Sequence, residues 1–172
     1  MVEYRDGDLF RANGELDIIA HQVNCQGEMR HGVAKRVRYL YRNVYREYKE
    51  MCLAYNKSDK LLGHVQVIDA EGYGTSRSML VANLFAQFIE SQEGVQTTDY
   101  SALKQSLLLL RIYCEELSFA VDGMWKIGIP YNIGCGYGGG DWETVKDIIH
   151  SVFEKSQIVK LIVFKFDVED GK

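Results

Sequence analysis

Residues 127–142 read IGIPYNIGCGYGGGDW, and this stretch indicates how the rest of the chain is arranged. Ile127 to Ile129 indicate the end of a buried strand, and Pro130 ends its ladder because proline has no N–H to donate. Five glycines between residues 134 and 140 let the backbone adopt positive φ and let a ligand approach it closely. Asp141 is a suitable N-cap for the helix that follows. A strand, a glycine loop and a helix N-terminus in this order favour binding of phosphate or diphosphate by backbone amides.

A second segment of the same kind lies nearer the N-terminus. Residues 16–23, LDIIAHQV, form a largely apolar run that includes the polar residue His21, as expected for a strand covered on both faces. The polar loop 24–32, NCQGEMRHG, follows, and from Val33 the apolar residues have helical spacing. Two such loops at neighbouring strand ends predict a diphosphate held from both sides, with little positive side-chain charge.

Two better-known phosphate motifs fit these loops less well. Gly134, Gly136 and Gly139 match GxGxxG, but a dinucleotide-binding fingerprint belongs in the first strand–helix unit of a domain. Gly27 and Gly32 have the spacing of a P-loop, but Val33-Ala34 replaces the Lys-Ser/Thr pair that holds Mg²⁺ and triphosphate. We therefore expect neither a dehydrogenase nor a nucleoside triphosphatase.

The other segments predict alternating strands and helices. Further strands are expected at 2–5, 63–69, 79–85, 126–129 and 159–166, and helices at 33–44, 99–117 and 142–154, with 45–55 either continuing the first helix or starting another after a kink. A turn is expected at 71–76, a mobile polar loop at 88–98 and a frayed tail at 167–172. This order favours an α/β fold, a three-layer α/β/α sandwich around a mixed, mostly parallel sheet. Ligands of such sheets bind beyond the carboxyl ends of the strands.

Composition limits the classes of function. A chain of 172 residues is expected to form one domain, and its net charge of −4 argues against direct nucleic-acid binding, which needs a basic face. The sequence contains no apolar run of the ~18 residues that a membrane span requires. Its N-terminus, MVEYRDGD, lacks the apolar core of a signal peptide, and its four cysteines form no CxxC pair. We therefore expect a cytoplasmic protein with free thiols.

Four motifs in order resemble those of the macro domain. They are Asp8-Leu9 after the first strand, AHQVNCQGEMRHGVAKRV at 20–37, ANLFAQ at 82–87 with TTDYSAL at 97–103, and IPYNIGCGYGGGDW at 129–142. The chain looks most similar to the branch that holds ADP-ribose-1''-phosphate phosphatases and the terminal ADP-ribose protein glycohydrolase. The resemblance implies an α/β/α sandwich spanning residues 1–172 that binds ADP-ribose, or a derivative, in a cleft at the strand ends, with no cofactor.

The resemblance also implies roles for individual residues. Asp8 would accept a hydrogen bond from the adenine amino group, the Leu9 backbone would contact the ring edge, and Asn24 would hold hydroxyls of the distal ribose. Tyr137 would lie over that ribose, and Phe164 or Phe166 would flank adenine. The phosphate loops would consist of Gly32, Val33 and Ala34 on one side and of Gly134, Cys135, Gly136, Tyr137 and Gly138 on the other.

The catalytic residues differ between the two activities of that branch. The glycohydrolases have a lysine after the strand equivalent to 79–85 and an acid within the second loop, whereas this chain reads NLFAQ at 83–87 and has Gly138 in the loop. The phosphatases have a histidine just before the Asn-Cys pair, which His21 matches. The resemblance thus implies that His21, next to Asn24, acts as a general base or acid without a metal. His31 is a second candidate that would reach the distal phosphate.

Alternatives remain at each of these positions. His21 could be a satisfied core residue and His31 a solvated loop residue. Cys25 and Cys135 could join the two histidines in a zinc site, although their spacing is irregular. The predicted functions are accordingly a phosphatase acting on ADP-ribose-1''-phosphate, a non-catalytic reader of ADP-ribose, or a hydrolase that removes ADP-ribosyl groups from a macromolecule.

Overall fold

The computed structural model describes residues 1–12, 14–71 and 79–166. The strands are β1 (Val2–Asp6), β2 (Ile18–Asn24), β3 (Val65–Ala70), β4 (Met79–Gln87), β5 (Trp125–Pro130) and β6 (Val159–Lys165). The α-helices are α1 (Gly32–Leu40), α2 (Arg42–Ala54), α3 (Tyr100–Glu116) and α4 (Trp142–Phe153), and 3-10 turns occur at η1 (Leu9–Arg11), η2 (Asp59–Leu61) and η3 (Ser118–Ala120). No helix among the described residues is long and apolar enough to cross a membrane.

The six strands form one sheet in the order β1-β6-β5-β2-β4-β3. Every neighbouring pair is parallel except β3 and β4, so the predicted mixed, mostly parallel sheet is confirmed. The central strands β2 and β5 pair only through Ile18 with Ile127 and Ile19 with Gly128. Beyond Ile19 the two strands separate toward their carboxyl ends. A crevice therefore opens where ligands of α/β sheets bind.

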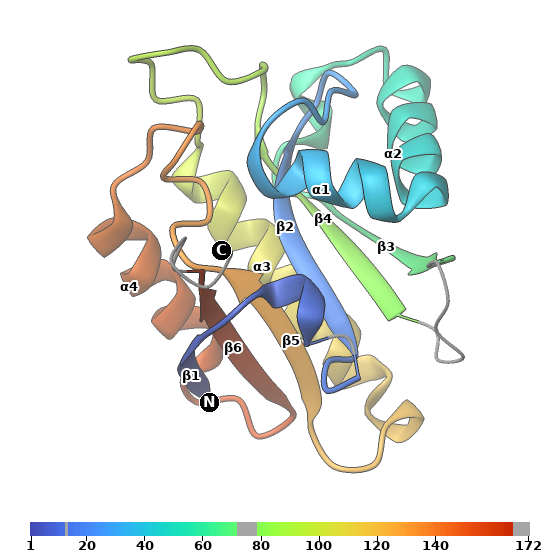
Figure 1. The fold of residues 1–172 in the computed structure, drawn as a ribbon, viewed down its shortest axis with the longest axis vertical. Coiled ribbons are helices and arrows are strands. Elements are labelled where there is room, and N and C mark those ends of the chain that lie inside the picture. The colour runs from blue at the N-terminus through green and yellow to red at the C-terminus, as the bar shows by residue number, and fades with distance from the viewer. Residues whose placement is uncertain (13, 72–78, 167–172) are drawn as a thin grey trace.

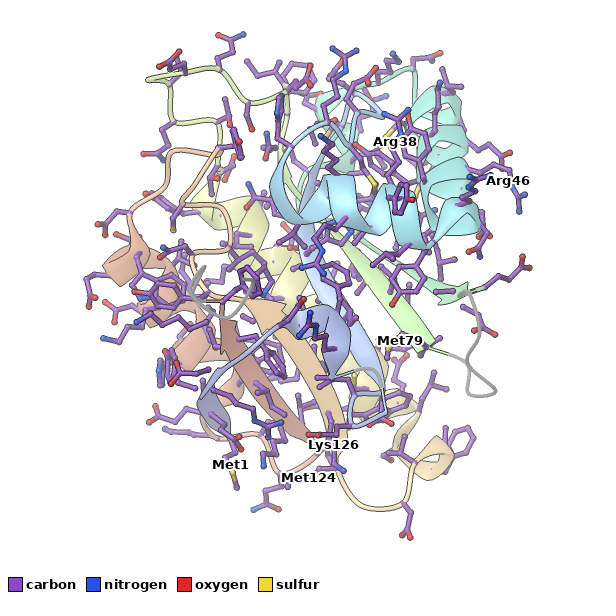
Figure 2. The ribbon with its side chains drawn as sticks, in the orientation of Figure 1. Met1, Arg38, Arg46, Met79, Met124 and Lys126 are labelled. Atoms are coloured by element: carbon purple, nitrogen blue, oxygen red, sulfur yellow. The ribbon has the colours of Figure 1, made fainter. Side chains whose placement is uncertain are left out.

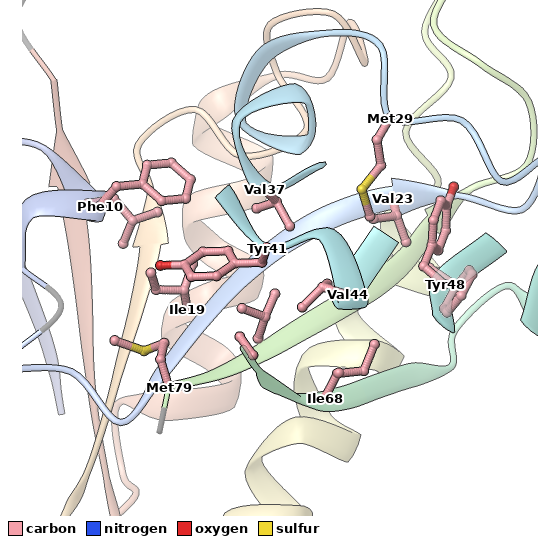
Figure 3. Packing of buried hydrophobic residues seen from close by; sticks show 14 of the residues in the cluster. Phe10, Ile19, Val23, Met29, Val37, Tyr41, Val44, Tyr48, Ile68 and Met79 are labelled. Atoms are coloured by element: carbon pink, nitrogen blue, oxygen red, sulfur yellow. The ribbon is translucent and has the colours of Figure 1, made fainter. Parts of the chain in front are cut away.

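Helices cover both faces of the sheet, which confirms the three-layer sandwich (Figure 1). One core lies between the sheet and the layer of α1 and α2, where Ile19 and Val23 of β2 lie close to Val37 and Val44 (Figure 3). The opposite core contains Ala20 of β2 together with apolar residues of α3 and α4. Successive β2 residues thus enter different cores, as the period of two along a strand requires.

Most strand and helix ends lie within two residues of the predicted ones, and two differences affect the core or the sheet. The first helix ends at Leu40, because Tyr41 leaves the helical conformation at φ −126° and ψ 81°, and α2 starts at Arg42 instead of Tyr45. The Tyr41 ring is buried in the first core, where it lies beside Ile19 (Figure 3). Pro130 is the last residue of β5, and the ladder continues for one more bond, from Tyr131 N–H to the Phe164 carbonyl. The predicted turn at 71–76, apart from Glu71, and the predicted tail at 167–172 lie outside the described residues.

Candidate functional site

A cleft of about 250 Å³ opens at the carboxyl ends of β2 and β5. Three segments that end at the same side of the sheet enclose it: the first loop, residues 24–32, the second loop, residues 131–140, and the segment after β4 (Figure 1). The side chains and backbone that line it belong to residues 21–24, 28, 30–34, 87, 90, 91, 130–134 and 136–138. The cleft therefore includes most of the predicted site, with the exceptions of Asp8, Leu9 and Cys135.

The N-terminus of α1 forms one wall of the cleft. His31 is the N-cap in an extended conformation, and the first helical hydrogen bond runs from Lys35 N–H to the His31 carbonyl at 3.1 Å. The N–H groups of Gly32, Val33 and Ala34 consequently have no acceptor among the described residues. Three free amides at the positive end of a helix dipole form an anion site.

The second loop forms the opposite wall, and hydrogen bonds of its carbonyl groups hold its shape. The Gly134 carbonyl accepts from Gly140 N–H at 2.9 Å and from the Thr98 hydroxyl at 2.7 Å, while the Gly138 carbonyl accepts from the N–H groups of Thr97 and Thr98. Within the described chain, the N–H groups of residues 136–138 have no acceptor. The loop thus presents amides to the cleft, as its glycine content predicts. Thr98, which lies in the segment predicted to be mobile, was missed.

An aromatic contact joins the two loops. The rings of His31 and Tyr137 stack with their centroids 4.8 Å apart and an interplanar angle of 25°. The Glu90 carboxylate lies near His31, with Oε1 3.8 Å from Nε2, and Oε2 lies 3.4 Å from Nη1 of Arg30. Glu90 lines the cleft and its Oε1 is buried without a hydrogen-bond partner. This carboxylate is a functional candidate that the sequence analysis missed.

His21 is buried at the inner end of the cleft, where its tautomer is set by a chain of hydrogen bonds. The Glu47 carbonyl can only accept, so Gln66 Nε2 donates to it at 3.2 Å, and Gln66 Oε1 accepts from Asn83 Nδ2 at 3.1 Å. Asn83 Oδ1 must then accept from His21 Nε2–H, 2.7 Å away. His21 Nδ1 therefore carries a lone pair, and it has no partner among the described residues.

Burial also sets the charge of His21. It lowers the pKa of the imidazole from 6.5 to about 4, although the hydrogen bond to Asn83 acts in the opposite direction. His21 is therefore neutral at pH 7 and can accept a proton at Nδ1. A group with this pKa is a weak base, and its conjugate acid readily gives the proton up.

The same shift predicts how stability depends on pH. Between pH 6.5 and 4 the unfolded chain binds a proton at His21 that the folded chain does not, so acidification through this window favours unfolding. A shift from 6.5 to about 4 corresponds to roughly 3 kcal/mol of lost stability. We expect urea unfolding at pH 7 and pH 4.5 to show most of this loss in the wild type, since the full loss is reached only below pH 4, and a clearly smaller loss in His21→Gln. An equal loss in both proteins would contradict the assignment.

The Asn24 side chain uses most of its hydrogen-bonding groups to hold the first loop. Its Oδ1 accepts from Gln26 N–H at 2.9 Å and lies 2.8 Å from the Tyr48 hydroxyl, and its Nδ2 donates to the Glu28 carbonyl at 2.8 Å. One Nδ2 hydrogen remains for a ligand, because an amide nitrogen carries two. The arrangement supports a role in shaping the loop in addition to the predicted contact with ribose.

Asp8 forms an ion pair with Arg36, a contact that the sequence did not predict. Arg36 donates to both carboxylate oxygens, at 3.0 and 2.9 Å, and its guanidinium lies 4.4 Å from the centroid of the Phe10 ring. Asp8 also caps η1 by accepting from Phe10 N–H at 2.9 Å. Burial alone would raise the pKa of Asp8, but these hydrogen bonds and the charges of Arg36 and Arg11 outweigh it and lower the pKa. The carboxylate is thus ionised and oriented, beside the buried Leu9.

The position expected for a lysine nucleophile contains an uncharged network. Gln22 Nε2 donates to Gln87 Oε1 at 2.9 Å and to the Thr98 hydroxyl at 2.8 Å, and this hydroxyl donates to the Gly134 carbonyl, so β2 and β4 are connected through Thr98 to the second loop. Gln22 Oε1 is buried without a partner. These amides can orient a ligand but cannot form a covalent amine intermediate.

Other predicted site residues lie away from the cleft. Phe164 is buried in the first core, whereas Phe166 is exposed, so only Phe166 is available to flank a ligand at the end of β6. Cys25 lies in the first core and Cys135 packs on the opposite core. Burial raises their pKa values to about 12 and about 11, so neither is a thiolate at neutral pH. Because Cys25 and Cys135 lie against different cores, the structure does not bring the four residues of the zinc alternative together, and the described residues contain no group of three or more His, Cys, Asp or Glu that could hold a metal.

The comparisons with known proteins agree with the observed fold. No family profile matches the sequence. The macrodomain of Mycobacterium tuberculosis DarG superposes with a TM-score of 0.75 at 24% identity, covering 95% of this chain and 97% of that one. This chain has the macro-domain fold. Thermosipho africanus DarTG in complex with ADP-ribose superposes with a TM-score of 0.71 at 16% identity, covering 97% of this chain and 42% of that one.

Two curated relatives of this chain carry different names. The DNA ADP-ribosyl glycohydrolase of Mycobacterium tuberculosis is 24% identical over 164 residues, which is 95% of this chain but only 42% of that protein. The ADP-ribose 1''-phosphate phosphatase of Lodderomyces elongisporus is 27% identical over 152 residues, 86% of this chain and 90% of that protein. The chain thus spans less than half of the mycobacterial relative and nearly the whole length of the yeast one.

Proposed function

We propose that this macro domain binds ADP-ribose or a derivative in the cleft and hydrolyses ADP-ribose-1''-phosphate to ADP-ribose and phosphate. The observation that carries the binding proposal is the pair of opposed amide walls, residues 32–34 and 136–138, which present free N–H groups without a lysine or a metal. Such walls suit a diphosphate. The names of both curated relatives contain an ADP-ribosyl or ADP-ribose group, which supports the same ligand.

His21 is the proposed base of the phosphatase reaction. Its Nδ1 lone pair accepts a proton from a water molecule whose oxygen forms the new bond to phosphorus. The bond between phosphorus and the 1'' sugar oxygen breaks, and this oxygen takes up the proton that His21 releases. The loop amides stabilise the negative charge on the phosphoryl oxygens.

A second candidate activity removes ADP-ribosyl groups from a macromolecule. It is favoured by the Glu90 carboxylate, whose buried, unpartnered Oε1 lies beside His31 at the mouth of the cleft. A carboxylate there can activate water for attack on the 1'' carbon of the distal ribose, so that the bond to the acceptor breaks.

One experiment separates these candidates. Wild-type protein is incubated with ADP-ribose-1''-phosphate in the presence of a chelator, and, separately, with an ADP-ribosylated oligonucleotide and an ADP-ribosylated protein. We expect phosphate from the first substrate. ADP-ribose released only from a macromolecule would replace the phosphatase with the second activity. Tight ADP-ribose binding without any product would identify a reader.

Arg36 provides a prediction for the adenine end of the site. We expect Arg36→Ala to weaken ADP-ribose binding by about tenfold, because Asp8 loses two hydrogen bonds that orient its carboxylate, and tenfold corresponds to about 1.4 kcal/mol. Isothermal titration with ADP-ribose and with ribose-5-phosphate, which lacks adenine, measures this. The affinity for ribose-5-phosphate should stay the same. Tighter binding of ADP-ribose by the variant would mean that Arg36 competes with adenine for Asp8.

A further inference from the structure

Positive charge is concentrated in one segment of this acidic chain. Residues 29–46 contain six Lys and Arg and no Asp or Glu, while the whole chain contains 20 Lys and Arg and 24 Asp and Glu. The residues outside this segment therefore have fourteen basic and twenty-four acidic side chains, a net charge of −10. The net charge of −4, which argued against nucleic-acid binding, is thus the sum of +6 in residues 29–46 and −10 in the rest of the chain.

The six basic side chains are exposed on α1, on the residues before it and on the start of α2. Figure 2 shows Arg38 and Arg46 on these helices. Arg36 and Arg30 form ion pairs, with Asp8 and with Glu28 and Glu90. In the part of the chain that the structure describes, Lys35, Arg42 and Arg46 pair with no carboxylate, and Arg38 lies 4.5 Å over the Tyr45 ring. Most of this charge is thus not neutralised by the carboxylates of the described residues.

Five of these side chains, all except Arg46, border a groove, which we call the basic groove. It has a volume of about 740 Å³ and is lined by Met29, Arg30, Lys35, Arg36, Arg38, Tyr39, Leu40 and Arg42. Tyr39 is 80% exposed, so its ring is available to a ligand. A basic groove that also offers an exposed aromatic ring suits a single-stranded nucleic acid, whose phosphates pair with the cations and whose bases stack on the ring.

The basic groove adjoins the mouth of the cleft. Arg30 lines both, and α1 contributes its first residues to the cleft and residues 35–40 to the groove. We propose that the basic groove binds a single-stranded nucleic acid. A nucleic-acid strand bound in the basic groove passes the stacked rings of His31 and Tyr137. The distal end of a bound ADP-ribosyl group is expected beside these rings. The binding of the strand itself does not depend on either activity proposed above.

Fluorescence anisotropy with labelled single strands of about 20 nucleotides, of DNA and of RNA, tests the proposal. Lys35→Glu/Arg42→Glu is compared with Lys104→Glu/Lys155→Glu, which changes the net charge equally on exposed sites of α3 and after α4. We expect at least about tenfold weaker binding for the first pair, less than about threefold for the second, and strong weakening by added salt. Tyr39→Ala should weaken single-strand binding about tenfold and leave duplex binding nearly unchanged.

Titration with ADP-ribose shows whether a variant that binds the oligonucleotides weakly is still correctly folded. The variants of the basic groove should bind ADP-ribose as the wild type does, because neither Lys35 nor Arg42 lines the cleft. Equal effects of the two charge-reversed pairs would overturn the proposal, as would the absence of wild-type binding at low salt. Tighter binding to anionic lipid vesicles or to polyglutamate than to the oligonucleotides would reassign the groove to a membrane or an acidic protein.

Discussion

Gly138→Ala is expected to lower the affinity for ADP-ribose by at least about a hundredfold, or about 2.7 kcal/mol. A Cβ at this position would overlap the Thr98 hydroxyl and lie 2.6 Å from the Gly134 carbonyl oxygen. These two atoms are hydrogen-bonded to each other, and the Gly138 carbonyl is held by the N–H groups of Thr97 and Thr98. The loop can accommodate the methyl group only by breaking the contacts that orient its free amides. Isothermal titration with ADP-ribose measures the loss.

Gly136→Ala is the matched comparison in the same loop. A Cβ at Gly136 meets no atom within 4 Å, so this variant should keep the melting temperature of the wild type and lose far less affinity than Gly138→Ala. Gly14→Ala lies far along the chain from the second loop, and a Cβ there likewise meets no atom within 4 Å. This variant controls for the general effect of replacing a glycine by alanine. Wild-type affinity in Gly138→Ala would show that the geometry of the second loop does not determine binding.

Local patterns in the sequence predict most of this fold. Asp141 was expected to cap the last helix, and its Oδ2 accepts from Thr144 N–H at 2.8 Å. The helix expected from Asp99 is confirmed, with the Asp99 carboxylate accepting from Ala102 N–H at 2.9 Å. Caps, apolar periodicity and glycine loops are properties of short segments, so they can be recognised without knowledge of the tertiary structure. The two amide walls were predictable for the same reason.

Pairings between distant residues were not predictable in this way. Arg36 meets Asp8 across 28 positions and His21 meets Asn83 across 62, and no local pattern connects either pair. One signal could have indicated the second pair: His21, Gln66 and Asn83 are polar residues within three largely apolar strands. In the sheet His21 lies opposite Asn83, and Asn83 lies opposite Gln66, so these residues form a polar row across the sheet. The register that aligns them becomes known only once the strand order is known.

His21→Ala is expected to lower phosphate release from ADP-ribose-1''-phosphate by about 10²–10⁴-fold, the usual contribution of a general base or acid. ADP-ribose titration of the same variant shows whether the cleft still forms, because a buried imidazole is removed. In the wild type the rate should stay level from pH 8 down to about pH 5 and then fall, because protonation of Nδ1 near pH 4 removes the base. An unchanged rate in His21→Ala would exclude His21 as the base.

Asn83→Asp tests the tautomer argument with a readout that loss of packing does not produce. A carboxylate at this position accepts the same hydrogen bond from Nε2–H, and its negative charge stabilises the imidazolium, so it raises the pKa of His21. Since the neutral imidazole is the active form, the acidic limb of the rate profile should move to higher pH. Asn83→Leu removes the acceptor, so both tautomers become populated and the rate at pH 7 should fall without such a shift. An acidic limb at the same pH in Asn83→Asp and in the wild type would show that Asn83 does not act on the titration of His21.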